Sequence, residues 1–164
     1  MELLDTAVLW VHLFSAVIFV GGSFFIWLVV MPASHRIAKD ESERTQIVGK
    51  IAKDFAKITN PTLGILVLTG LYNISWYLPS YQDLFAFQTY GEKVLFIKVV
   101  LSLILIFLIY AHGLYYGRKI VKLAQERNVE GLRAVRKRSR IISFANLGLM
   151  ITILVLAALL QMPP

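Results

Sequence analysis

The sequence contains no cysteine, and it has few histidines, methionines and acidic residues. Its 164 residues include 10 Asp and Glu against 17 Lys and Arg, with 3 His and 4 Met. The absence of cysteine excludes disulfides, thiolate metal sites and cysteine nucleophiles, but it does not identify the compartment. Soft ligands for a metal are therefore limited to the histidines and to Met31 and Met150, which lie in or near apolar segments.

Hydrophobic residues are abundant instead, and they come in long blocks. They make up 57% of the chain, and the mean hydropathy of +0.67 is too high for an ordinary soluble domain. A helix that crosses a bilayer needs about 20 apolar residues. Four blocks approach this length, at residues 7–31, 61–78, 94–116 and 141–161. We therefore predict an all-α, integral membrane four-helix bundle, formed as a single domain by residues 1–164.

The positive charge is confined to two segments between these blocks. Of the 17 Lys and Arg, six lie in residues 36–57 and nine in residues 118–140. Short loops rich in Lys and Arg stay on the cytoplasmic side of a membrane. This predicts an N-out/C-out protein of the plasma (inner) membrane with both basic loops in the cytoplasm. The placement also argues against nucleic-acid binding, despite the net charge of +7.

Helix is expected to extend beyond the membrane on the cytoplasmic side. Apolar residues recur at helical spacing among the lysines of residues 40–57, so the second helix should begin in the cytoplasm. The third helix should continue to about Glu126. We also expect Met31-Pro32 to end the first span and Asn60-Pro61 to kink the second.

Polar and ionisable side chains lie inside the apolar blocks, where they mark functional-site candidates. At 1.5 Å per residue, His12, Asn73 and Lys98 each fall roughly 9–10 Å inside the outer boundary. His112 falls roughly 8 Å inside the inner boundary, and His35 lies at the inner surface. This predicts two polar layers, one near each face, and bundle cores of this kind hold cofactors and metals on facing helices.

Each of these residues also has a simpler interpretation. Lys98 can extend outward to the surface as a helix anchor, His112 can merely hydrogen-bond another helix, and His35 can be an ordinary interfacial residue. Three glycines can either serve as packing contacts or clear room for a flat macrocycle. They are Gly21, Gly22 and Gly70.

Several motifs together resemble the copper-resistance D (CopD) domain. They are HLFSAVIFVGGSFFIWLVVMP in the first block, VLTGLYN in the second, and TYGEKVLFIK leading into the third. The resemblance implies a four-helix inner-membrane module linked to copper uptake or tolerance. The positions that it implies are His12, Gly22, Thr69, Gly70, Asn73, Gly91 and Lys98.

A second likeness is to HemJ-type protoporphyrinogen oxidases, small membrane proteins that bind b-type haem. It rests on His12 ten residues before Gly22, and on Lys98 followed by the pair His112-Gly113 and by an arginine. The lysine–histidine spacing is about a turn longer here, and an arginine expected late in the first span is absent. With these two departures, the likeness implies haem binding rather than porphyrinogen oxidation.

Three functions follow from these observations. The first is binding of haem b by His12 and His112, with Lys98, Asn73 and His35 as further cofactor-binding residues. Such a protein would be a membrane haem oxidoreductase or electron-transfer subunit with a redox partner or as a homo-oligomer. The alternative is a copper transport or tolerance protein, with copper on the same two histidines. The third is a non-catalytic membrane subunit or assembly factor whose polar layers only join helices.

Overall fold

The computed structural model describes residues 3–78, 80–126 and 128–161, and the part it describes is almost entirely helical, with no strand. The all-α prediction is confirmed. Four long helical rods follow one another along the chain. The first rod consists of α1 (Leu3–Phe25), a π-helical segment η1 (Ile26–Val30) and α2 (Met31–Ile37), and the second is α3 (Glu41–Tyr77). The third rod consists of α4 (Tyr90–His112), a π-helical segment η3 (Gly113–Gly117) and α5 (Arg118–Gln125). The fourth rod is α6 (Val129–Leu159). A short 3-10 helix η2 (Tyr81–Phe85) lies between α3 and α4.

Side-chain caps define where three of these rods begin. The Asp40 carboxylate accepts a hydrogen bond from the backbone N–H of Glu43 at 2.7 Å at the start of α3. Thr89 and Glu92 form a reciprocal capping box at the start of α4, and the Asn128 side chain caps α6. Each cap satisfies backbone N–H groups that have no partner within the helix. The caps therefore fix the residues at which α3, α4 and α6 begin.

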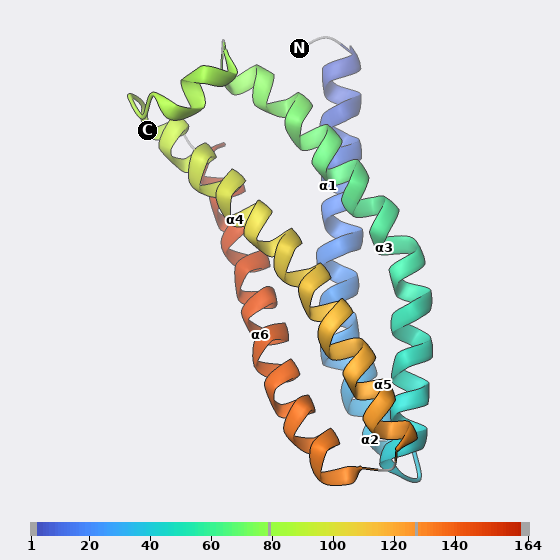
Figure 1. Cartoon of the computed structure of the whole chain (residues 1–164). Helices are drawn as coiled ribbons and strands as arrows, with labels where there is room; N and C mark the ends of the chain where they lie inside the picture. Colours follow the sequence, from blue (N-terminus) through green and yellow to red (C-terminus); the bar gives the residue numbers. More distant parts are fainter. Residues whose placement is uncertain (1–2, 79, 127, 162–164) are drawn as a thin grey trace.

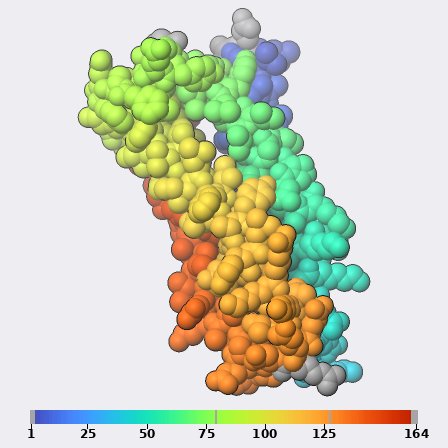
Figure 2. Space-filling view, viewed as in Figure 1, coloured from blue at the N-terminus to red at the C-terminus, as the bar shows by residue number. Residues whose placement is uncertain are grey.

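The rods form two antiparallel hairpins, α1 with α3 and α4 with α6, which pack into a four-helix bundle (Figure 1). The turns from α2 to α3 and from α5 to α6 lie at one end, together with the Lys- and Arg-rich segments, and we call this the basic end. The start of α1, the connection from α3 to α4 and the end of α6 lie at the other end, which we call the terminal end. In the space-filling view α4 and α5 lie between α6 and α3 (Figure 2).

Three rods are long and apolar enough to cross a membrane. Among the described residues these are Leu3–Ile37, Tyr90–Gln125 and Val129–Leu159. The rods α1 and α4 both run from the terminal end to the basic end (Figure 1). The rod α3, which is less apolar and lies between them in the sequence, returns the chain to the terminal end. A bilayer crossed by α1 and by α4 must therefore be crossed by α3 as well, which accords with the prediction of four spans.

The core lies where all four rods meet, and the outside of the bundle is apolar too. The central cluster contains residues from each rod: Phe19, Leu63, Leu105, Leu147 and Met150. Large apolar side chains such as Phe14, Leu68 and Phe107 are exposed on the outside. A surface of this kind is stable only in contact with lipid, so the fold is that of a membrane protein.

The helices continue through both prolines, while the span end at Pro32 and the kink at Pro61 stay predictions. The first rod continues through Pro32 to Ile37. The wide π-helical turn of η1 lies just before the proline, and Pro32 occupies the first turn of α2, where its lack of a backbone N–H costs no helical hydrogen bond. The helix α3 is also unbroken at Pro61. Its axis leans toward α4 over the second half of its length (Figure 1).

The contact between α1 and α3 gives a first testable prediction, at Gly22. A Cβ atom at Gly22 would lie 2.5 Å from Cε2 of Phe55, whereas one at Gly21 would meet nothing within 4 Å. We expect Gly22→Leu to lower the free energy of unfolding by about 1–3 kcal/mol, the usual cost of overpacking. Gly21→Leu is the matched control and should change it little. Measurement of unfolding in mixed detergent micelles checks this, and equal losses in the two variants would contradict the close packing.

Candidate functional site

The best-defined polar contact inside the bundle joins His12 of α1 to Thr69 of α3. The distance from His12 Nδ1 to Thr69 Oγ1 is 2.8 Å. The single hydroxyl hydrogen of Thr69 is donated to the carbonyl of Ile65 at 2.6 Å. Thr69 Oγ1 must therefore accept from Nδ1–H of His12, which leaves Nε2 as the imidazole nitrogen with a free lone pair. A nitrogen in this state can bind a metal.

Gly70 makes this contact possible. A Cβ atom at residue 70 would lie 3.3 Å from Cε1 of His12, so the imidazole ring packs directly on the glycine. A Cβ at this position would require the ring to shift by a few tenths of an ångström. His12, Thr69 and Gly70 therefore form one unit, which we call the histidine site.

Asn73 and Lys98 lie in the same half of the bundle. Asn73 is one helical turn beyond Thr69 on α3; it is 8% exposed, and its Oδ1 has no hydrogen-bond partner among the described residues. Lys98, from α4, is half-buried and close enough to His12 for its charge to act on the ring. The salt bridges in the described part of the chain do not include Lys98. That His12, Asn73 and Lys98 form one polar layer stays a prediction.

The second polar layer belongs to the other hairpin. Nε2 of His112 is 2.9 Å from Oγ of Ser139 and 3.5 Å from Oγ of Ser143, both on α6. The His112 ring also packs against Tyr116, with 5.3 Å between ring centroids. Asn146 follows one turn after Ser143; it is buried, and its Oδ1 lacks a partner within the described residues. His112 is thus a member of a polar network between α4 and α6.

His35 belongs to neither layer. It is exposed on α2, near the charges of Arg44, Arg136 and Arg140. A cationic neighbourhood opposes binding of a metal ion, so the structure favours the simpler interpretation of His35 as a surface residue. Across the described residues no group of three or more His, Asp, Glu or Cys side chains converges on one point.

Sequence reasoning missed a polar cluster at the basic end, made of Ser34, Glu41, Arg44, Thr45 and Arg136. We call it the arginine cluster. Arg136 pairs with the Glu41 carboxylate and donates to Thr45 Oγ1. Arg44 is 6% exposed and donates from Nε to Ser34 Oγ at 3.2 Å. Burial lowers the pKa of the Arg44 guanidinium, and the nearby charge of Arg140 adds to this. In the sequence these arginines look like ordinary loop cations.

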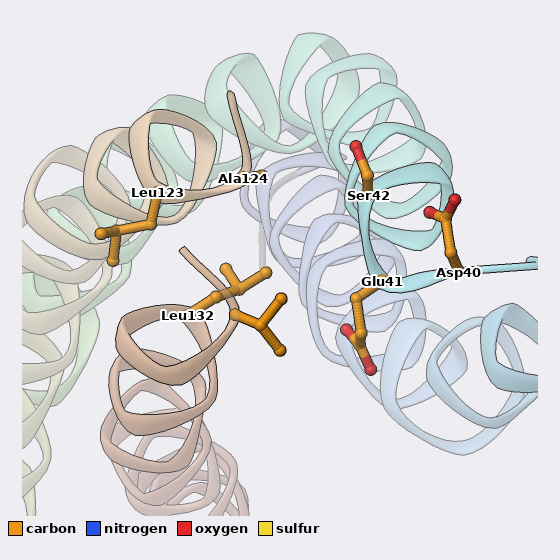
Figure 3. Close-up of a pocket in the computed structure, with 7 residues that line it drawn as sticks. Asp40, Glu41, Ser42, Leu123, Ala124 and Leu132 are labelled. Atoms are coloured by element: carbon orange, nitrogen blue, oxygen red, sulfur yellow. The ribbon is translucent and has the colours of Figure 1, made fainter. Parts of the chain in front are cut away.

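A pocket of about 430 Å³ also lies at the basic end, between the start of α3, the end of α5 and the start of α6. Figure 3 shows Leu123 and Leu132 on one side and Asp40, Glu41 and Ser42 on the other. The polar side carries carboxylates while the other side is apolar. The histidines do not line this pocket, so it is separate from both polar layers.

These observations define a helical membrane protein, a four-helix bundle with a hydrogen-bonded histidine in each of its two hairpins. Residues 49–160 match the family model of copper resistance protein D, and the chain belongs to this CopD family. The match includes Thr69, Gly70, Asn73, Lys98 and His112 and begins after the first rod, so His12 lies outside it. The likeness to HemJ-type oxidases stays a resemblance. No curated protein and no solved structure matches the chain.

Proposed function

We propose that this CopD-family membrane protein takes copper ions into the membrane, and that Nε2 of His12 is the first copper ligand. The observation that supports it best is the hydrogen bond from His12 to Thr69 at 2.8 Å, which orients the imidazole and leaves Nε2 without a proton. Imidazole nitrogen is a good ligand for copper. A fixed hydrogen bond on the other ring nitrogen raises the basicity of a metal-binding histidine.

The donor set suits transfer rather than storage. One imidazole and the unpartnered Oδ1 of Asn73 offer a weak site, because soft thiolate ligands are absent from the sequence. A site that passes an ion onward must bind it weakly enough to release it. Met150, which is 5% exposed in the central core, supplies a thioether between the two layers. His112 lies roughly 20 Å from His12 along the bundle and would be the second position.

Haem b is the second candidate, and Lys98 favours it. A half-buried ammonium near His12 opposes a bare copper cation, whereas it could pair with the propionate of a haem bound through His12. The glycines weigh against it, because the space beside Gly22 is filled by Phe55 and the space beside Gly70 by His12 itself. This close packing beside the two glycines supports their interpretation as packing contacts. A haem protein would act in electron transfer, with a redox partner or as a homo-oligomer.

The purified protein distinguishes these functions. On the copper proposal it binds copper when titrated in detergent, and it shows no Soret band after expression with ample haem. A Soret band with sharp bands in the reduced state would replace the copper proposal with the haem one. A protein that binds neither would leave a structural subunit or assembly factor, and both proposals would fail.

The membrane orientation is a second prediction for the same preparation. We expect the basic end to face the cytoplasm, because short loops rich in Lys and Arg are retained there. The sequence has no cysteine, so single cysteines at Ser42 and Ser80, both exposed, report the two ends separately. An impermeant thiol reagent on intact cells should label Ser80→Cys and leave Ser42→Cys unlabelled. The reverse pattern would invert the orientation.

A further inference from the structure

At the basic end, the arginine cluster and Arg140 together carry more positive charge than the one carboxylate that pairs with them among the residues that the structure describes. Three guanidinium groups gather there: Arg44 and Arg136 from the arginine cluster, and Arg140, which lies near enough to Arg44 and to His35 for their charges to interact. Within the described residues Glu41 is the carboxylate that pairs with them, through Arg44 and Arg136. No carboxylate pairs with Arg140 in the described part of the chain.

The hydrogen bonds of the arginine cluster show which groups are already engaged. Arg136 is held by the Glu41 carboxylate, by the Glu41 carbonyl at 3.3 Å and by Thr45. Arg44 is held by Ser34, and its Nη1 lies 3.5 Å from Glu41 Oε1. The cluster therefore holds two arginines in place, and Arg140 lies one helical turn after Arg136 on α6 with its side chain exposed. An exposed guanidinium next to fixed positive charges favours binding of an anion.

The surroundings of Arg140 place this charge at a membrane surface. The apolar run of α6 begins at Ile141, which is 63% exposed, and Ile37 at the end of α2 is 68% exposed. His35 and Arg36 are exposed on the same short helix. Apolar side chains that face lipid thus adjoin exposed cations, as happens at the level of lipid headgroups.

We propose that the surface around Arg140, supported by Arg44 and Arg136, binds the phosphate of an anionic phospholipid in the leaflet at the basic end. Guanidinium groups bind phosphate oxygens through paired, charge-assisted hydrogen bonds. The acyl chains of the lipid would lie along the exposed apolar side chains at Ile37 and Ile141. This proposal is independent of what the histidines bind.

The test compares Arg140→Gln with Arg138→Gln in the full-length protein. Both changes remove one positive charge from an exposed side chain of α6, but two residues correspond to about 200° of helical rotation, so Arg138 faces away from the site. Native mass spectrometry in detergent gives the apparent Kd for added dioleoyl phosphatidylglycerol. We expect Arg140→Gln to raise this Kd about fivefold and Arg138→Gln to change it less than twofold, while Arg140→Lys retains most of the affinity.

Two further probes separate the sources of the phosphate. Dioleoyl phosphatidylcholine, which has no net charge, should bind at least fivefold more weakly, and inorganic phosphate should not displace phosphatidylglycerol at equal concentration. Equal losses in Arg140→Gln and Arg138→Gln would overturn the proposal, since they would indicate only the overall charge. Displacement by inorganic phosphate alone would overturn the assignment to a lipid.

Discussion

Replacing His12 with alanine is expected to lower the affinity for copper more than a hundredfold, because the change removes the imidazole that we propose as the first ligand. Thr69→Val should have a smaller effect, about 10–100-fold, because it keeps the shape of the side chain but removes the acceptor for Nδ1–H. Copper titration of each purified variant against a competing chelator measures both effects. If the bound group is haem, the same order of losses should appear in the Soret absorbance.

The matched control for Thr69→Val is Thr62→Val. Thr62 is a buried threonine of the same helix, and its hydroxyl donates to the carbonyl of Ile58 at 2.8 Å within α3. This variant removes a hydroxyl without touching His12, so copper affinity should stay within about twofold of the unchanged protein. If Thr69→Val and Thr62→Val behave alike, the hydrogen bond does not tune the histidine. Full copper affinity in His12→Ala would remove His12 from the site.

The second large effect is expected from Glu41→Gln in the arginine cluster. The change keeps the size of the side chain but leaves Arg44, which is 6% exposed, and Arg136, whose side chain is 18% exposed, without their carboxylate. Removing one partner of a buried ion pair costs about 3–5 kcal/mol. Because the Glu41 side chain is 39% exposed, we expect a loss near the lower end, about 3 kcal/mol. Unfolding in mixed detergent micelles measures it.

Asp54→Asn provides the comparison. It breaks the ion pair from Lys57 to Asp54, whose atoms are 2.6 Å apart, with side chains that are 68% and 61% exposed. Exposed ion pairs contribute at most about 1 kcal/mol to stability. We therefore expect Asp54→Asn to lower the free energy of unfolding less than Glu41→Gln, although the Lys57–Asp54 distance is shorter than the 3.5 Å between Arg44 and Glu41. Equal effects of Asp54→Asn and Glu41→Gln would show that the arginine cluster contributes no more than a surface contact.

The helices could be predicted from the sequence because their signals are local. Apolar blocks of membrane length, caps such as Asp40 and Thr89, and two separate Lys- and Arg-rich segments are all readable without tertiary contacts. The π-helical segments were not predicted from the sequence. Nor was the continuation of helix through Pro32, which lies in the first turn of α2 directly after η1.

The residues of the candidate site could be picked out from the sequence, but the contacts between them could not. His12 was recognisable as an ionisable group inside an apolar block, and Thr69 and Gly70 lay in a recognisable motif. Their meeting depends on the register of α1 against α3 across 57 residues of chain, which one sequence does not specify. The arginine cluster is harder still, because Arg136 and Thr45 are 91 residues apart and resemble ordinary loop residues. Its one sequence signal is an acidic residue, Glu41, at the edge of a basic segment.

The hairpin arrangement bears on how the chain enters the membrane during synthesis. His12 is hydrogen-bonded to Thr69 within the first hairpin, and His112 to Ser139 within the second. Each imidazole thus has a partner before the two hairpins meet, which lowers the cost of transferring it into hydrocarbon. The contacts of Arg136 with Glu41 and Thr45 join the hairpins at the basic end, among the charged segments. This arrangement is compatible with insertion one helical pair at a time, with the charged contact joining the two pairs at the basic end.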